Sequence, residues 1–307
     1  MPMNHKSVFI TIGFFDGMHR GHQAIIQALK QRAQKKGTSV VLTFLNHPLH
    51  IIQGHASIPL LMRRQDLFEM LRSTFQVDHI KIIPFTKAFS KKSPEDFIQW
   101  IRQQYGHLRE IIVGENFRFG FQASGNLNTL KKLGKKCGFK VRGAPSVQLH
   151  HQVISSSKIR RLLSQGKVAQ ANAMLGHTYY LSGRVIPGRH RGRTWNIPTA
   201  NLSIDSNPVL KDGVYVAKVL WKRKFYPAIM NLGMRPTFFR KNSSSRIAEV
   251  HIMDFDQNMY RQYLKVYLFH YLRNEKKFSN PSDLIQQIHH DIAAARQWNM
   301  QSVVKSL

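Results

Sequence analysis

Short apolar runs alternate with helical patterns along the first half of the chain. Each run is rich in β-branched or aromatic residues and is long enough for one buried strand. The predicted strands are Val8–Ile12, Val40–Phe44, His79–Phe85 and Glu110–Val113. Between them, apolar residues recur three or four positions apart, which is the spacing of an amphipathic helix. This alternation predicts an α/β domain with a doubly wound, mostly parallel sheet.

The helix after the third strand has the clearest start signals. Ser93 is a capping residue, Pro94 takes the first helical position, and Glu95 and Asp96 place two acids in the first turn. These signals predict a helix that runs from here to about Tyr105.

The pattern changes in the second half of the chain. Gly166–Leu175 has a helical pattern ended by Gly176, and we expect its Ala and Leu face to pack back on the first domain. The following short strands, divided by Gly and Pro turns, predict a small antiparallel β-barrel with a C-terminal helix. The predicted domains are therefore residues 1–177 and 178–307.

The composition is typical of globular domains, with 42% hydrophobic and 20% charged residues. No apolar run approaches the ~18 residues of a membrane span. Met1–Lys6 has no apolar signal core, so we expect no membrane association and a cytoplasmic location. Cys137 is the only cysteine, which excludes an internal disulfide framework and fits a reducing compartment. We expect it in a turn before a strand, as a structural residue.

The formal net charge of +30 first suggests nucleic acid as a partner. However, the basic excess is spread over both halves of the chain and comes largely from scarce carboxylates. No long basic tail and no nucleic-acid-binding motif accompany it. We therefore expect weak polyanion binding without sequence preference, attraction of anionic substrates such as ATP, and a monomer or weak homo-oligomer.

The stretch Gly13–His22, Gly-Phe-Phe-Asp-Gly-Met-His-Arg-Gly-His, has the strongest candidate chemistry. It joins a predicted strand to a predicted helix, where free backbone N–H groups and the helix dipole favour an anion. His19 and His22 lie on one face of the first helical turn, so both can donate hydrogen bonds to phosphate oxygens, and Arg20 adds charge. The alternative is a βα turn with two solvated histidines.

This stretch resembles the His-x-Gly-His signature of the nucleotidylyltransferase superfamily, in the form that its flavin-adenylating branch uses. The resemblance implies that His19 and His22 are catalytic. It also implies contacts to ATP and its phosphates from Gly13, Phe15, Asp16, Gly17 and Gly21.

A histidine follows the second predicted strand. His47 lies in Asn46-His47-Pro48, and the carboxyl ends of parallel strands line the ligand crevice of such sheets. We expect it to face the same cleft as His19 and to contact flavin, although an ordinary loop histidine explains the pattern as well. The family usually has Pro-His-Pro here, often after an acid, and this chain does not carry that acid.

Two aromatic residues and an arginine follow the fourth predicted strand. Asn116, Phe117 and Arg118 stand between Gly114 and Gly120 in a segment that could hold a planar ring and a phosphate, or that could plug the core. The flavin adenylyltransferases have a matching Gly-Glu-Asp/Asn-Phe-x-Phe-Gly segment. The resemblance implies that these three residues bind flavin.

Three serines close the first half of the chain. Ser155 or Ser156 would cap the next helix, and Lys158 and Arg160 offer charges to a triphosphate. Simple capping is the alternative. The segment resembles the second superfamily signature, Ile-Ser-Ser-Thr/Ser-x-Ile-Arg, which implies that Ser155, Ser156 and Arg160 bind phosphates.

A basic, glycine-rich loop begins the second half. Gly183, Gly188 and Arg193 belong to a loop whose amides and arginines could clamp phosphates, although basic loops are usually just solvated. Thr199 and Asn201 follow it and offer oxygen ligands of the kind that Mg²⁺ prefers. A turn with polar ends is the alternative.

The segment Gly-Arg-Thr-Trp-Asn-Ile-Pro-Thr-Ala-Asn resembles the riboflavin kinase signature, with Trp195-Asn196-Ile197 in place of the usual Leu-Gly-Phe. Later segments match in order, with Arg261 where a glycine is usual. These segments are Gly213–Tyr215, Asn231–Phe238, Glu249–His251, Leu272–Phe278 and Gln287–Asp291. The resemblance implies that Thr199 and Asn201 hold the metal and that Glu249 is the base. On chemistry alone, Glu249 could accept a proton from an alcohol or be a surface acid.

The resemblance covers about residues 8–296 and implies a bacterial-type bifunctional riboflavin kinase and FMN adenylyltransferase. Its implied substrates are riboflavin, FMN and ATP, its product is FAD, and its cofactor is Mg²⁺. One alternative is an enzyme with a single surviving activity, since the departures at Asn46, Trp195 and Asn196 are where decay would start. Another is a nucleic-acid-binding protein built on a nucleotidyltransferase fold.

Overall fold

The computed structural model describes residues 6–34, 36–48, 51, 58–188, 195, 197–204, 208–234 and 246–304, with side chains to residue 298. The chain divides into two compact units, Met1–Ser156 and Ser157–Leu307, which we call unit 1 and unit 2. The predicted domain boundary at residue 178 stays a prediction.

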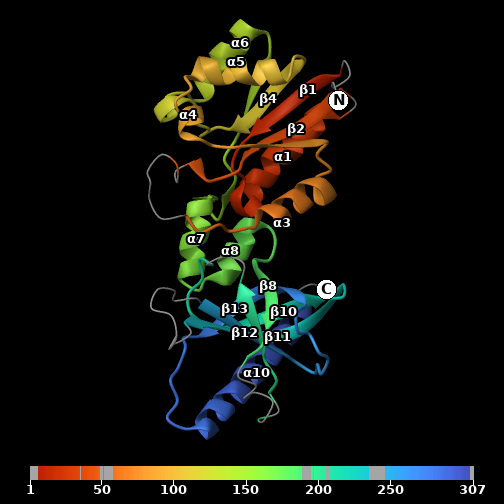
Figure 1. Ribbon diagram of the computed structural model, residues 1–307, viewed down its shortest axis with the longest axis vertical. Coiled ribbons are helices and arrows are strands. Elements are labelled where there is room, and N and C mark those ends of the chain that lie inside the picture. Colours follow the sequence, from red (N-terminus) through yellow and green to blue (C-terminus); the bar gives the residue numbers. More distant parts are fainter. Residues whose placement is uncertain are drawn as a thin grey trace. The chain divides into compact units, whose positions relative to one another are not determined.

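Unit 1 is built on a five-stranded parallel sheet with the strand order β3-β2-β1-β4-β5 (Figure 1). The strands are β1 Ser7–Ile12, β2 Gly37–Phe44, β3 His79–Ile83, β4 Leu108–Gly114 and β5 Lys140–Ala144. The order reverses between β1 and β4, which is the switch point where ligands bind in open α/β sheets. The predicted doubly wound sheet is confirmed.

Helices cover both faces of this sheet, so that it has a hydrophobic core on each side. The helices are α1 Arg20–Ala33, α3 Arg64–Glu69 with a π-helical end Met70–Thr74, α4 Lys87–Ser90, α5 Pro94–Gln104 and α6 Leu127–Cys137. Ile26 and Leu29 of α1 pack in one core, whereas Ile98 of α5 and Leu130 of α6 pack in the other. A short hairpin of β6 Gln148–Leu149 and β7 Gln152–Val153 follows β5.

Two details of the sequence analysis can be checked at helix ends. The Ser93 hydroxyl accepts a hydrogen bond from the Asp96 N–H at 3.0 Å, and the Asp96 carboxylate accepts one from the Ser93 N–H, so the predicted cap is confirmed. The expected turn at Cys137 is wrong, because this residue ends α6. The turn comes one residue later, where Gly138 adopts φ 81°.

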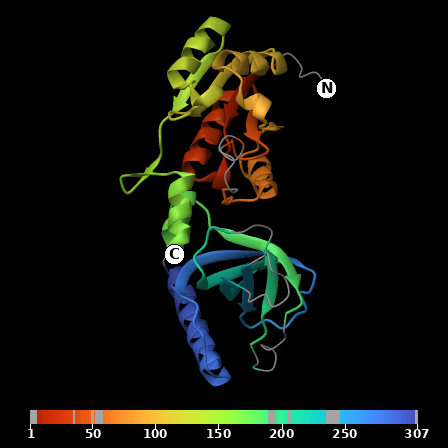
Figure 2. The same ribbon diagram turned by 60° about the vertical axis from the view of Figure 1, so that its left-hand side comes forward.

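Unit 2 contains a closed barrel with the strand order β10-β11-β12-β9-β8-β13, whose paired strands are antiparallel. The strands are β8 Tyr180–Ile186, β9 Ala200–Ile204, β10 Gly213–Trp221, β11 Lys224–Met234, β12 Arg246–Ile252 and β13 Tyr263–Arg273. The C-terminal helix α10, Pro281–Val304, packs along the outside of the barrel on Val216 and Ile229 (Figure 2). The predicted barrel and terminal helix are confirmed.

Two short helices precede the barrel, α7 Ser156–Ser164 and α8 Val168–Leu175. We expected the apolar face of α8 to pack on the first domain, and this is wrong, because α8 packs on β13 of unit 2. The Asn172 amide donates to the Leu268 carbonyl at 2.9 Å and accepts from the Tyr179 N–H at 2.8 Å. An apolar face predicts that a helix packs on a hydrophobic core, but it does not predict which of two cores the helix joins. Within the part of the chain described, no helix is long and apolar enough to cross a membrane.

Candidate active sites

The turn after β1 has an unusual backbone. Gly13 donates its N–H to the Leu42 carbonyl at 3.1 Å, and the chain then enters a one-turn helix, Asp16–Met18. Phe15, Gly17 and Met18 all have positive φ, at 55°, 74° and 40°. Such a conformation is costly for residues with a side chain and is maintained only where the surroundings enforce it, often at functional sites.

Asp16 connects this turn to a distant segment. Its side chain is buried, and its carboxylate accepts hydrogen bonds from the Leu61 N–H at 2.9 Å and the Met62 N–H at 3.3 Å. The Ser156 hydroxyl donates to the Asp16 carbonyl at 3.1 Å. The two predicted phosphate motifs of the first half therefore meet at Asp16.

The two histidines lie at the start of α1. His19 is the N-cap residue, and its Nδ1 accepts a hydrogen bond from the His22 N–H at 3.3 Å. The two imidazole rings are stacked with their centroids 3.6 Å apart. A Cβ on Gly21 would come within 3.1 Å of the His19 ring, so glycine leaves room for this ring.

Burial decides the charge of both rings. It lowers the pKa of His19 to about 4, and burial together with the neighbouring His19 lowers the pKa of His22 well below 6.5. Both rings are therefore neutral at pH 7. Because His19 Nδ1 accepts a hydrogen bond, its proton is on Nε2, which leaves that atom as the hydrogen-bond donor.

The predicted flavin-binding residues have different surroundings. The His47 ring meets the Phe14 ring edge-on, with centroids 4.6 Å apart, so it lies beside the phosphate turn. Asn116 is exposed and donates to the Ser146 hydroxyl at 3.3 Å, and Arg118 is exposed. Phe117 is half-buried at the edge of the core, so part of this segment plugs the core as well.

The remaining predicted residues of the first half lie around α7. Ser155 directly precedes this helix, and Arg160 is on it. Because Arg160 falls in unit 2, whereas the histidines are in unit 1, its role at the phosphate site stays a prediction.

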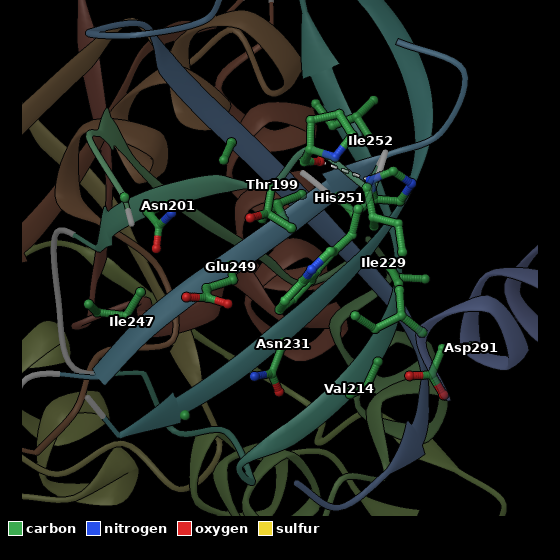
Figure 3. Close-up of a pocket in the computed structure, with 18 of the residues that line it drawn as sticks. Thr199, Asn201, Val214, Ile229, Asn231, Ile247, Glu249, His251, Ile252 and Asp291 are labelled. Atoms are coloured by element: carbon green, nitrogen blue, oxygen red, sulfur yellow. Dashed lines mark hydrogen bonds between the residues drawn. The ribbon is translucent and has the colours of Figure 1, made fainter. Parts of the chain in front are cut away.

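In unit 2, polar side chains from three neighbouring strands line one cavity of about 790 Å³ (Figure 3). Glu249 of β12 is directly opposite Asn231 of β11 on one side and Asn201 of β9 on the other. Side chains directly opposite each other on adjacent strands have Cβ atoms about 5 Å apart. The register therefore sets an exposed carboxylate between two amides on one wall of the cavity.

The predicted loop and metal residues border the same wall. Thr199 is exposed at the cavity, whereas Asn201 is only 8% exposed. A Cβ on Gly188 would come within 2.1 Å of the Asn201 amide nitrogen, so the loop passes directly over this amide. Gly183 lies on β8, close against the Ser203 carbonyl of β9, where its role is packing between strands. Arg193 lies outside the described residues.

Two residues of this cavity were not among the predicted site residues. Asn231 donates from its amide nitrogen to Glu275 at 3.2 Å, and both side chains line the cavity. A Cβ on Gly233 would come within 1.9 Å of the Glu275 carboxylate, so a larger residue here would displace this side chain. Asn231 and Gly233 fall in a segment that resembles riboflavin kinase, but only the strand register shows that Asn231 lies beside Glu249.

The far side of the cavity is fixed by an ion pair. Arg273 at the end of β13 contacts the buried Asp291 of α10 with Nε···Oδ1 at 2.9 Å and Nη2···Oδ2 at 2.7 Å. Gln287 donates to the same carboxylate at 3.1 Å. This network fastens α10 to the strand that leads to Glu275.

A turn of the phosphate-binding type on a parallel sheet and a carboxylate-lined cavity between a barrel and its C-terminal helix point to an enzyme with two candidate sites for phosphate chemistry. Comparison with known families agrees. Residues 1–158 match the family model of FAD synthetase, and residues 175–299 match that of riboflavin kinase. The chain belongs to the family of bifunctional riboflavin kinases/FMN adenylyltransferases, which make FMN from riboflavin and FAD from FMN.

Curated relatives support this along nearly the whole chain. The bifunctional riboflavin kinase/FMN adenylyltransferase of Buchnera aphidicola from Acyrthosiphon pisum is 35% identical, over 96% of this chain and 94% of the relative. The Haemophilus influenzae and Escherichia coli proteins of the same name are 35% and 31% identical, each over 94% of this chain and 92% of the relative.

A solved structure has the same fold over the whole chain. The crystal structure described as a macrolide-efflux protein from Streptococcus pneumoniae is 27% identical, has a TM-score of 0.87, and covers 97% of this chain and 96% of its own. That description applies to the pneumococcal protein.

Proposed function

We propose that the two reactions take place at the two separate sites described above. Riboflavin phosphorylation belongs to the cavity of unit 2, and FMN adenylylation to the turn between β1 and α1. The observation that carries the kinase assignment is the row Asn201–Glu249–Asn231, which sets a carboxylate among neutral amide groups in a cavity of substrate size.

In the kinase reaction, Glu249 aligns the 5′-hydroxyl of riboflavin and accepts its proton. A primary alcohol is a poor nucleophile at neutral pH, so a carboxylate within hydrogen-bond reach accelerates the attack. The freed alkoxide oxygen attacks the γ-phosphorus of ATP, and ADP leaves. No covalent enzyme intermediate is needed, because positioning and charge stabilisation supply the catalysis.

The donor set at this cavity suits Mg²⁺. Thr199 offers a hydroxyl, Asn201 an amide oxygen and Glu249 a carboxylate, and a hard cation prefers such oxygens. Thr199 and Asn201 would hold the ion, which neutralises phosphate charge when bound. Two protein oxygens leave room for water and phosphate oxygens, as is usual for this ion. Gly188 and Arg193 would cover the phosphates, whereas the predicted phosphate contact of Gly183 is wrong, because this residue packs within β8 against β9.

In the adenylyl transfer, the FMN phosphate attacks the α-phosphorus of ATP, and pyrophosphate leaves. His19 and His22 donate hydrogen bonds to the phosphates as neutral rings, each from the ring nitrogen that carries its proton, and so stabilise the charge that develops there. Ser156 and Arg160 add further donors, and Gly13, Gly17, Gly21 and Ser155 complete the anion site. FMN is bound by His47, Asn116, Phe117 and Arg118.

Two predicted ATP contacts receive a more specific role. The Asp16 carboxylate is already bound by two backbone N–H groups, and the Phe15 ring is buried against Gly13. We assign both residues to holding the turn in its conformation. They act on the nucleotide through the backbone that they fix.

One incubation tests the function directly. Pure protein with riboflavin, ATP and Mg²⁺ should form FMN first and then FAD, as identified by chromatography of the flavins. Excess EDTA should stop FMN formation, and Mg²⁺ in excess should restore it. FMN as the final product would instead support the single-activity alternative. Unchanged rates in EDTA would remove Mg²⁺ from the proposal.

The absence of a specific nucleic-acid partner and the monomeric or weakly associated state are part of the same proposal. The even distribution of charge along the chain supports the first. Gel filtration with light scattering would test the second. A sequence-selective RNA or DNA complex that survives physiological salt would contradict the first.

A further inference from the structure

A second cavity, of about 510 Å³, lies at one edge of the sheet of unit 1. It is lined by four basic side chains and a single carboxylate, namely Arg32 of α1, Lys131 of α6, Lys140 and Arg142 of β5, and Glu110 of β4. Neither reaction proposed above uses these residues. Four positive charges around one negative charge leave a local excess of three.

The carboxylate holds the two arginines in place. Glu110 is only 2% exposed, and its two oxygens accept from Arg32 Nε at 2.9 Å and Arg142 Nε at 3.2 Å. Each guanidinium is thus fixed through Nε, which leaves its two Nη groups as further donors. Planar guanidinium groups fixed in this way are suited to bind phosphate oxygens in pairs.

The two lysines add two positive charges to the cavity. Lys140 is directly opposite Glu110 in the strand register, and Lys131 reaches the cavity from α6. Within the described parts of the chain, neither lysine has a hydrogen-bond or ion-pair partner. Like charges that line one cavity repel one another, and a bound anion offsets this repulsion.

The cavity is also separate from the adenylyl transfer site. Glu110 and Lys140 lie near the amino ends of β4 and β5, whereas the turn with His19 follows the carboxyl end of β1. In a parallel sheet the amino ends of all strands lie on one side and their carboxyl ends on the opposite side. The cavity is therefore not an extension of the nucleotide site.

We propose that this cavity binds an anion that presents two or more adjacent phosphate groups. Closely spaced phosphates match a cluster of two fixed guanidinium forks and two mobile ammonium groups. The source can be free pyrophosphate, which adenylyl transfer releases, or the phosphates of a nucleic-acid strand. The proposal depends on neither the His19 nor the Glu249 assignment.

The test uses two charge-matched variants of the full chain. Lys131→Glu with Lys140→Glu reverses the lysines of the cavity, whereas Lys135→Glu with Lys136→Glu reverses two exposed lysines of α6 outside it. Both variants change the net charge equally. Binding of inorganic pyrophosphate is measured by titration calorimetry without metal ions, and thermal unfolding checks that each variant is folded.

We expect the cavity variant to bind pyrophosphate about tenfold more weakly or worse, and the control variant to bind within about twofold of the unchanged protein. Equal losses in both variants would show that the overall charge attracts the anion, and would overturn the proposal. Unchanged binding in both would leave only the catalytic site as a binder, and would overturn it too.

Two additions complete the test. If the cavity variant does not fold, Lys131→Gln with Lys140→Gln takes its place, with Lys135→Gln and Lys136→Gln as its control. The same variants are then titrated with a single-stranded oligonucleotide. A loss confined to the cavity variant for both ligands identifies a site for phosphates of either source, whereas a loss for pyrophosphate alone identifies the free anion as the ligand.

Discussion

The two active sites are built in opposite ways. The proposed adenylyl transfer site takes both of its histidines from one stretch of ten residues, Gly13–His22, to which Ser156 is attached by a hydrogen bond. The kinase cavity gathers Asn201, Asn231 and Glu249 from three strands, together with residues of α10. Hydrogen bonds to Leu42, Leu61 and Met62 hold the contiguous motif, whereas the cavity depends on the register of three strands and on the helix that packs beside them.

The electrostatics of the two sites differ as well. Burial keeps His19 and His22 neutral, so this site offers hydrogen-bond donors without fixed charge. Glu249 is exposed to its cavity and keeps a carboxylate in contact with solvent. The histidine site therefore depends on the exclusion of water from its rings, whereas the kinase cavity depends on where the Glu249 carboxylate is placed.

The largest expected effect comes from dividing the chain. Residues 157–307 should fold alone and phosphorylate riboflavin, whereas residues 178–307 should be less stable by ~5 kcal/mol or more. The shorter fragment loses α8, whose Met174 and Leu175 are buried, and each lost buried side chain costs about 2–5 kcal/mol. Urea unfolding of both fragments measures the difference. Equal stability of the two fragments would support the predicted boundary at residue 178.

Glu249→Gln should lower the rate of riboflavin phosphorylation by about 10³-fold and leave FMN adenylylation unchanged. Glutamine keeps the size of the side chain but cannot accept the proton. Two assays on the same protein, riboflavin to FMN and FMN to FAD, measure this. A parallel loss of both activities would mean that the sites are coupled or that Glu249 is structural.

His19→Ala and His22→Ala should each lower FAD formation from FMN by about 10²-fold, because each removes one donor that stabilises charge in the transition state. Riboflavin phosphorylation should continue. His79→Ala, which changes an exposed histidine of β3, is the matched control and should affect neither reaction. Near-normal FAD formation in the double variant would remove the histidines from the site.

Gly188→Ala should raise the KM for ATP in the kinase reaction about tenfold. The added methyl group would lie only 2.1 Å from the Asn201 amide nitrogen and would therefore push this amide out of place. Gly106→Ala, where a Cβ meets nothing within 4 Å, is the control. If the control and the variant give the same KM, the contact between the loop and Asn201 has no part in ATP binding.

The smallest effect concerns pH. The pKa of His19 is about 4 in the folded chain and 6.5 in the unfolded chain, so the unfolded chain binds more protons between these values. The free energy of unfolding of unit 1 should therefore fall as the pH falls through this window, on the order of 1 kcal/mol by pH 5.5. Thermal midpoints at pH 7.5 and 5.5 should differ less in His19→Asn than in the unchanged protein. The same difference in both would assign the loss to other groups.

The sequence was sufficient for elements whose signal is local. Strand and helix periods predicted the parallel sheet, and the cap at Ser93 needed only its neighbours. His19 and His22 could be placed at a helix start because strand, turn and helix follow one another without a break.

The sequence was not sufficient where a side chain finds its partner far along the chain. Asp16 looked like a phosphate contact, but its carboxylate meets backbone groups 45 and 46 residues away. Asn231 was named only as part of a segment that resembles riboflavin kinase, because its position beside Glu249 depends on the register of β11 and β12. The face of α8 is apolar enough to pack on either core, and the hydrogen bonds of Asn172 decide between them.

The closure of the barrel has a consequence for how the protein is made. The first strand of the barrel, β8, pairs with the last, β13, so the kinase cavity cannot form before Arg273 has been synthesised. The sheet of unit 1 needs nothing beyond Ala144, and Ser156 completes the turn. Since domains fold in order during synthesis, unit 1 can fold while the chain is still on the ribosome, and on the proposed assignment of the sites the second reaction of FAD formation becomes possible before the first.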